Sequence, residues 1–206
     1  MTLMSNLLPS SSVELSWRNP LVVTLDGVFS PAECAGLIER IERAGPTPAP
    51  VSTARGPVMR PDLRTNDRVM FDDPALAGLI FGRLKPHLPS RLEGAWTMVG
   101  ANERLRCYRY RPGQAFAPHY DGSFHRSEDE VSLLTVLLYL NACEAGGATQ
   151  FLDLERLVEP AQGRVLVFNH HLLHEGCPVL AGLKYVVRTD LMFQRERPCP
   201  QSARGS

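Results

Sequence analysis

The pattern of apolar and polar positions predicts a strand and a helix at the start of the globular part of the chain. Residues 20–29, PLVVTLDGVF, are typical of a short strand. Residues 30–45 predict a helix, because Ser30 and Glu33 have the spacing of a capping box and Gly45 provides a stop.

A second helix is predicted over residues 73–87, before Pro89. Its apolar stripe consists of Leu76, Leu79, Ile80 and Leu84. Between the helices, residues 45–61 are rich in Pro, Ala and Gly and show no periodicity. We therefore expect a loop there, and long loops are often functional.

From residue 96 onward, short apolar segments alternate with turn residues. The segments that predict strands are RLRCYRY (104–110), AFAPHYD (115–121), VSLLTVLLYL (131–140), ATQFLDL (148–154), RVLVFN (164–169) and KYVVRTDLMF (184–193). Short strands at this spacing favour a sandwich or barrel. The predicted fold is therefore mainly β with flanking helices (α+β), an antiparallel core buttressed by two N-terminal helices.

Length and composition favour one domain over residues 1–206. We expect a helical buttress with loops in residues 1–95, the β core in 96–195 and a tail in 196–206. The 22 basic and 22 acidic side chains cancel, which argues against nucleic acid or an anionic membrane as partner.

The cysteines and the apolar segments indicate where in the cell the protein is expected. The five cysteines are odd in number and include no C-x-x-C pair, so we expect free thiols rather than disulfides or a zinc site. The N-terminus lacks the pattern of a signal peptide, and the longest apolar run is too short to span a bilayer. A soluble, cytoplasmic protein is expected.

Candidate chemistry begins with His119 and Asp121 in the segment APHYDGSF. Alternate side chains of a strand share a face, so this pair can bind one metal ion. The same triplet is also typical of an ordinary polar strand end, and the rest of the chain has to decide.

A third ligand should come from FNHHLLHEGCPV. We favour His174, because Glu175 and Gly176 are expected to start a turn that fixes its imidazole at a strand end. His170 and His171 are interpreted as surface or turn residues. Two imidazoles and a carboxylate suit non-haem Fe(II), although zinc accepts them too.

The strand period places Lys184, Val186, Arg188 and Asp190 on one face of KYVVRTDLMF. Cations in such a strand are costly unless they are paired or bound to an anion. The alternatives are a strand end with solvated charges and a carboxylate-binding site beside the metal. Convergence with His119, Asp121 and His174 favours the second.

Three segments together resemble the Fe(II)/2-oxoglutarate-dependent oxygenases, in their prolyl 4-hydroxylase-like branch. They are YRPGQAFAPHYD (110–121), LLYLNACEAGGATQF (137–151) and HEGCPVLAGLKYVVR (174–188). The resemblance covers roughly residues 100–193, and it implies a double-stranded β-helix, or jelly roll. One departure is Asp190, where the family often has an aromatic residue.

The resemblance also implies the site. The implied iron ligands are His119, Asp121 and His174; the implied co-substrate residues are Lys184 for the distal carboxylate of 2-oxoglutarate, with Tyr110 and Thr149, and Arg188 in reserve. The cofactors implied are Fe(II), 2-oxoglutarate and O2, with ascorbate as an accessory candidate. The hard chemistry then belongs to the metal.

The expected reaction is hydroxylation of an unactivated C–H bond in a protein residue (prolyl-like) or a small amino-acid-like molecule, with release of succinate and CO2. The candidate residues for binding the substrate are Asn66, Arg68, Arg106 and Tyr108. A purely structural role, in helix capping and salt bridges, is an equal alternative for them. Residues 45–61 and 122–130 are candidate lids.

The rival functions are a cupin-type oxygenase or isomerase without 2-oxoglutarate, and a non-catalytic sensor of the same fold.

Overall fold

The computed structural model describes residues 20–53, 55–92 and 95–196. The expectations for the N-terminal signal sequence, Cys199 and the tail beyond residue 196 lie outside these residues. The first half contains β1 (Val22–Leu25), α1 (Pro31–Arg43), β2 (Thr47–Pro48), β3 (Val51–Thr53), β4 (Gly56–Val58), β5 (Asp67–Asp72), α2 (Pro74–Leu84), the 3-10 turn η1 (Lys85–His87) and β6 (Arg91–Leu92). The second half contains β7 (Trp96–Ala101), β8 (Arg104–Tyr110), β9 (Phe116–His119), β10 (Glu130–Tyr139), β11 (Ala145–Gly146), β12 (Thr149–Phe151), β13 (Arg156–Val158), β14 (Val165–Asn169), β15 (His174–Gly176), β16 (Val179–Ala181) and β17 (Lys184–Arg195).

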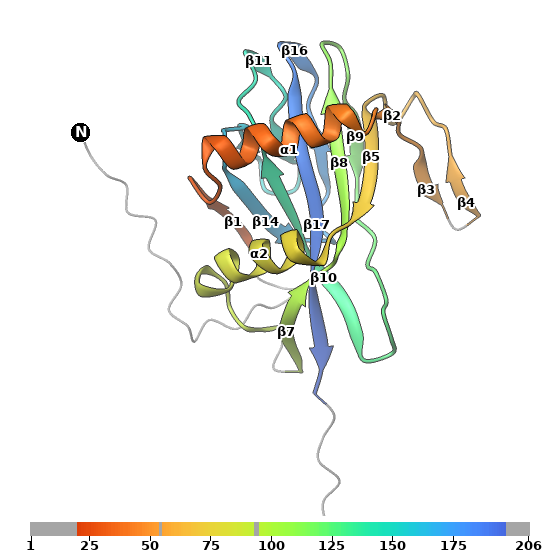
Figure 1. The fold of residues 1–206 in the computed structure, drawn as a ribbon. Helices are drawn as coiled ribbons and strands as arrows, with labels where there is room; N and C mark the ends of the chain where they lie inside the picture. Colours follow the sequence, from red (N-terminus) through yellow and green to blue (C-terminus); the bar gives the residue numbers. More distant parts are fainter. Residues whose placement is uncertain (1–19, 54, 93–94, 197–206) are drawn as a thin grey trace, which may run out of the picture.

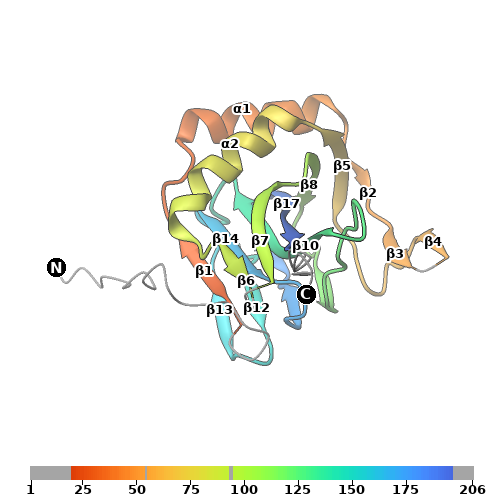
Figure 2. The ribbon, with the colours of Figure 1, turned by 90° about the horizontal axis from the view of Figure 1, so that it is seen from below.

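Two antiparallel sheets form the core. The large sheet runs β1-β14-β10-β17-β8-β5-β2, with β7 and β6 attached to β17, and the small sheet runs β13-β12-β15-β9. Both helices cover one face of the large sheet, and β12 and β13 lie on its opposite side (Figures 1 and 2). This arrangement confirms the predicted mainly β fold, a jelly roll buttressed by two helices.

Both helices begin where their local sequence predicts, whereas α2 ends at Leu84 and a 3-10 turn takes the chain on to His87. The Ser30 hydroxyl accepts from the Glu33 backbone N–H while the Glu33 carboxylate accepts from Ser30, which closes the capping box. The Asp73 carboxylate caps α2 by accepting from the backbone N–H of Leu76. In the apolar stripe of α2, Ile80 and Leu84 are buried, whereas Leu79 is 42% exposed.

The alternation of side chains along the central strand β17 separates two apolar cores. Tyr185 and Val187 face the helices, and Val186 faces the small sheet. The helix-side core also contains Cys34, Ile41, Ile80, Leu84, Leu105, Cys107, Val136 and Leu138. The second core, between the sheets, contains Tyr108, Tyr110, Tyr139, Phe151, Phe168, Leu172 and Val179. Polar side chains that point into this second core therefore lie between the two sheets.

Two local expectations were wrong. Residues 45–61 are not a structureless loop, because β2 pairs with β5 and β3 pairs with β4 in a hairpin. Glu175 and Gly176 do not start a turn, because they continue β15 and pair with Gln150 and Thr149 of β12. The pairings of β2 with β5 and of β15 with β12 join residues far apart in the chain and override the local turn chemistry, whereas β3 and β4 form a local hairpin.

In the described part of the chain, neither helix has the length and apolar character needed to cross a bilayer.

Candidate metal centre and co-substrate pocket

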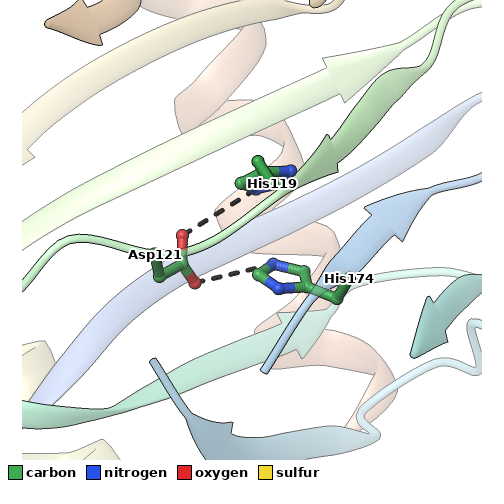
Figure 3. Close-up of side chains that lie close together, drawn as sticks. All are labelled: His119, Asp121 and His174. Atoms are coloured by element: carbon green, nitrogen blue, oxygen red, sulfur yellow. Dashed lines mark ion pairs between the residues drawn. The ribbon is translucent and has the colours of Figure 1, made fainter. Parts of the chain in front are cut away.

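Adjacent strands of the small sheet bring the three predicted metal-binding side chains together. His119 ends β9 and is paired in register with His174, which begins β15. Asp121 follows two residues after His119 and points between the two imidazoles (Figure 3). Its Oδ1 lies 3.8 Å from His119 Nε2, and its Oδ2 lies 3.6 Å from His174 Nε2.

The hydrogen bonds of the two imidazoles show which ring nitrogens face the centre as acceptors. His119 Nδ1 lies 2.8 Å from the Ala117 carbonyl, and His174 Nδ1 lies 2.9 Å from the Leu172 carbonyl. A carbonyl can only accept, so each Nδ1 carries the proton and each Nε2 of the neutral ring presents a lone pair. This backbone anchoring is the usual support of a metal-bound histidine.

The electrostatics keep all three groups in their ligand forms. Burial lowers the pKa of His119 to about 4, and it also lowers the pKa of His174. Burial by itself would raise the pKa of Asp121, but the neighbouring Arg188 and the two histidines hold it well below its usual range. Three acceptors whose ligand atoms all lie within 4.8 Å of one another, with no proton to share, fit a cation. The donor set suits a divalent metal of the Fe(II) or Zn(II) type.

Both oxygens of Asp121 are held from outside this centre. Thr135 of β10 donates its hydroxyl to Oδ2 at 2.6 Å, and Arg188 Nη2 lies 3.1 Å from Oδ1. Thr135 Oγ1 also lies 2.8 Å from His170 Nδ1. Because the single threonine proton goes to the carboxylate, His170 Nδ1 is the donor in that contact.

His170 is therefore not a surface residue, and that part of its interpretation was wrong. It lies in the turn after β14 but is only 4% exposed. Its Nε2 lies 3.0 Å from the Ser132 hydroxyl, which in turn accepts from the backbone N–H of Phe124. Burial lowers the pKa of His170 to about 4, so the ring is neutral. A chain of hydrogen bonds thus runs from Phe124 through Ser132, His170 and Thr135 to Asp121.

A cavity extends from the three candidate ligands between the two sheets. Its lining includes Tyr108, Tyr110, Leu137, Thr149, Lys184, Val186 and Arg188, beside His119, Asp121 and His174. The predicted co-substrate residues Lys184, Tyr110, Thr149 and Arg188 therefore share one cavity with the predicted ligands. Lys184 pairs in register with Tyr110, and the Thr149 hydroxyl shares a hydrogen bond of 2.7 Å with that of Tyr139.

The two cations of the cavity differ in their partners. Arg188 Nη2 lies 3.1 Å from Asp121 Oδ1 and 3.1 Å from Asp190 Oδ1, so two carboxylates neutralise it. Lys184 is only 3% exposed, and its Nζ lies 5.1 Å from the centre of the Tyr110 ring. Among the described residues no carboxylate forms an ion pair with Lys184, and burial lowers its pKa to about 8. The cavity is thus lined by an ammonium group that has no ion pair with any described residue.

The four candidate substrate residues lie in different places. Arg106 lines a second cleft, beside His119 and Asp121, together with Val51 and Ser52 of β3 and Gly122, Ser123 and Phe124. Both proposed lid segments therefore contribute to its wall. Tyr108 lines the cavity, and Arg68 pairs with Tyr108 in the adjacent strand. Asn66 is fully buried; its side-chain oxygen accepts from Arg64 Nε at 2.8 Å.

Thr135, Ser132 and Arg64 were not among the predicted site residues, and His170 was interpreted as a surface or turn residue. A signal for the first two existed, since they are hydroxyl residues within the otherwise apolar segment VSLLTVLLYL. Arg64 begins the polar segment RTNDR, but only its stacking against two rings distinguishes it. His170 carried no local signal, because its role depends on partners in β10.

Comparison with known proteins supports the same chemistry. A model of the 2OG-Fe(II) oxygenase superfamily matches residues 105–189, the segment that contains His119, Asp121, His174 and Lys184.

Individual relatives agree with the family match. "Probable prolyl 4-hydroxylase 7" of Arabidopsis thaliana is 24% identical over 212 residues, which cover 86% of this chain and 64% of that protein. "Putative prolyl 4-hydroxylase" of Acanthamoeba polyphaga mimivirus is 31% identical over 113 residues, which cover 46% of each. This chain therefore spans less than two thirds of either relative. The crystal structure of the viral collagen prolyl hydroxylase of Paramecium Bursaria Chlorella virus-1 shares the fold, with a TM-score of 0.59 and 22% identity over 84% of this chain and 96% of that one.

Proposed function

We propose that this chain, which is similar to the 2OG-Fe(II) oxygenases over residues 105–189 and to several prolyl 4-hydroxylases, is a dioxygenase that uses Fe(II), 2-oxoglutarate and O2 to hydroxylate a C–H bond. Succinate and CO2 are the expected by-products. One observation carries the proposal. His119, Asp121 and His174 lie together as three unprotonated acceptors, and they line the same cavity as the buried cation Lys184.

In this proposal His119 Nε2, Asp121 and His174 Nε2 hold ferrous iron. When bound there with 2-oxoglutarate, the iron supplies the activation of O2 that no protein side chain can provide. The protein keeps each imidazole in the acceptor tautomer through the Ala117 and Leu172 carbonyls. Thr135 and Arg188 fix the rotation of the Asp121 carboxylate.

Lys184 is proposed to bind the distal carboxylate of 2-oxoglutarate. A buried ammonium group without a counter-ion is costly, so a carboxylate that enters the cavity restores neutrality there. The Tyr110 and Thr149 hydroxyls line the same wall and can donate hydrogen bonds to it. Arg188, held in reserve for this role, is already neutralised by Asp121 and Asp190. Lys184 is therefore the better anchor.

The relatives are named as prolyl 4-hydroxylases, which favours a prolyl-like residue of a peptide or a small amino-acid-like molecule as substrate. A cupin-type reaction without 2-oxoglutarate gives no role to the unpaired Lys184, and a sensor that has lost its chemistry is usually missing a ligand. We further propose a cytoplasmic location, supported by the free thiols of the described cysteines, and ascorbate as an accessory reductant.

The proposal is tested with the purified protein under nitrogen. Fe(II) and 2-oxoglutarate should together give a visible charge-transfer band that neither gives alone, and O2 should then yield succinate. Asp121→Ala should abolish the band by losing the metal. Turnover of a substrate without the band or any need for 2-oxoglutarate supports the cupin reaction, and a band without succinate for any substrate supports the sensor.

A further inference from the structure

Four arginines lie around Tyr108, and three of them, Arg64, Arg106 and Arg188, line the cleft beside the candidate metal centre. Arg106 lies two residues before Tyr108 on β8, and Arg188 pairs with Arg106 from β17. Arg68 pairs with Tyr108 from β5, and the Arg64 guanidinium lies 4.6 Å from the centre of the Tyr108 ring. We call Arg64, Arg68, Arg106 and Arg188 the arginine cluster.

The carboxylates that pair with the arginine cluster are fewer than its cations. Asp190 contacts Arg106 and Arg188, and Asp121 contacts Arg188. Four guanidinium groups against these two carboxylates leave an excess of two positive charges. A divalent metal together with the dianion of 2-oxoglutarate adds no net charge, so the excess persists in the proposed reactive complex.

Arg64 and Arg68 are the members without a carboxylate. Arg64 is only 6% exposed, and its Nη2 has no hydrogen-bond partner among the described residues. Arg68 is half-buried and has no ion pair within the described ranges; burial and the repulsion of the other three arginines lower its pKa. Two cations left in this state are unfavourable unless an anion joins them.

Arg64 is also held in place before any ligand arrives. Its guanidinium lies between the Tyr108 ring and the Phe116 ring, 4.4 Å from the centre of the latter, and its Nε donates to Asn66. Phe116 stacks in turn on His119, at 3.6 Å between ring centres. Arg64 lines the same cleft as His119 and Asp121, and its Nη2 is buried behind the cleft surface without a hydrogen-bond partner among the described residues.

Local electrostatics agree with a strong positive potential at this point. Burial by itself would raise the pKa of the Tyr108 hydroxyl, but the charges of Arg64, Arg188 and Arg106 lower it below its usual value. Stacking of Arg64 on aromatic rings accounts for its position but leaves the charge excess unexplained. An acidic ligand accounts for both.

Resting on the proposed hydroxylase function, we propose that the substrate carries a carboxylate, which Arg64 and Arg106 bind at the cleft wall and the charge of Arg68 attracts, while the C–H bond to be hydroxylated faces His119 and Asp121. The carboxylate can be the free α-carboxylate of an amino acid or the acidic side chain of a peptide. Guanidinium–carboxylate hydrogen bonds give selectivity for such groups over amides.

The test compares matched acids and amides on the protein loaded with Fe(II) and 2-oxoglutarate under nitrogen, so that the Lys184 cavity is filled. One series contains L-amino acids and their α-amides, and the other contains short peptides that differ by Glu or Gln. Binding is measured by calorimetry, and succinate is measured after O2 is admitted. At least one acid should bind about 10- to 100-fold more tightly than its amide, as a charged hydrogen bond predicts. The series in which it occurs identifies the source of the carboxylate.

Variants separate the outcomes. Arg68→Gln and Arg64→Lys should reduce the preference for the acid by about tenfold, and Arg104→Gln, two residues from Arg106 on β8, should not. Equal binding of acids and amides, no binding by any acid at millimolar concentration, or a preference that survives in both cluster variants overturns the inference. Acid-selective binding without 2-oxoglutarate turnover would instead remove the proposed function and leave the carboxylate site standing.

Discussion

Thr135 Oγ1 lies 2.6 Å from Asp121 Oδ2 and connects that carboxylate to the buried ring of His170. The hydroxyl donates to Asp121 and accepts from His170, so its direction is set on both sides. The candidate ligand with the most freedom to rotate is thereby held by a strand of the opposite sheet.

Replacement of Thr135 by Val keeps the shape of the side chain and removes this hydrogen bond. We expect the affinity for Mn(II) or Fe(II) to fall about 10- to 100-fold, the usual effect of losing a group that supports a metal ligand. Calorimetric metal titration without 2-oxoglutarate measures it. Thr135→Ser retains the hydroxyl and should bind almost as tightly as the native protein; equal loss in Ser and Val would show that packing is responsible.

Replacement of Lys184 by Met tests the proposed co-substrate anchor. The variant should bind 2-oxoglutarate about 100-fold more weakly, because the distal carboxylate loses a buried ionic partner. Metal affinity should stay near the native value, since Lys184 lies outside the ligand set. If 2-oxoglutarate binding is unchanged in the variant, the anchor is Arg188, and Arg188→Met should then show the loss.

The same lysine predicts a pH dependence of 2-oxoglutarate binding. Its pKa in the free protein is about 8, lowered by burial, and the dianion binds the protonated amine. Affinity should therefore be constant below about pH 8 and fall by up to about tenfold per pH unit above it, until the higher pKa of the complex is reached. Titrations from pH 7 to 9.5 measure this profile. Lys184→Met should bind 2-oxoglutarate weakly, with no fall in affinity above about pH 8. The same fall in the variant would show that another group titrates there.

His170 predicts that acid destabilises the fold. Its pKa is about 4 in the folded protein because of burial, against about 6.5 for an ordinary histidine. Between these values the unfolded chain binds more protons, so the stability that His170 contributes above pH 6.5 is lost as the pH falls toward 4. The loss is on the order of 3 kcal/mol.

Urea unfolding at pH 7 and at pH 5 measures this effect. His170→Asn should unfold more easily than the native protein at pH 7 but lose less stability between the two pH values. The exposed residue His87 provides the control, since His87→Gln should retain the native difference. A full native pH difference in His170→Asn would assign the acid sensitivity to other groups.

Gly147 leaves space for the side chain of Lys184. It has a φ of +77°, and an added Cβ would lie 2.8 Å from Cys143 Sγ and 3.4 Å from Lys184 Cδ. Gly147→Ala should cost about 1–3 kcal/mol of stability and also weaken 2-oxoglutarate binding. Gly113, with a φ of +83° and nothing within 4 Å of its added Cβ, gives the matched control. Gly113→Ala should lose stability but bind 2-oxoglutarate normally; equal binding defects in both variants would contradict the steric explanation.

Much of the fold follows from local sequence. The capping box at Ser30, the Asp73 cap and the strands from RLRCYRY to KYVVRTDLMF lie close to their predicted positions, because caps and side-chain periodicity depend on neighbours in the chain. The strands of residues 45–61 escaped prediction, because a segment rich in Pro and Gly has no alternation, and β2 forms through β5, about twenty residues away.

The site divides in the same way. Periodicity alone determined that Lys184 and Arg188 share a face, since the strand repeat of two is a local property. It also predicted one face for His119 and Asp121, although β9 ends at His119 and Asp121 follows outside the strand. Only the tertiary structure decided that Arg188 is neutralised while Lys184 is not, that His170 is buried behind Thr135, and that Arg64 lies between two rings. Those relationships depend on the register between strands far apart in the chain, and register is set by non-local pairing and burial rather than by the residues of any one strand.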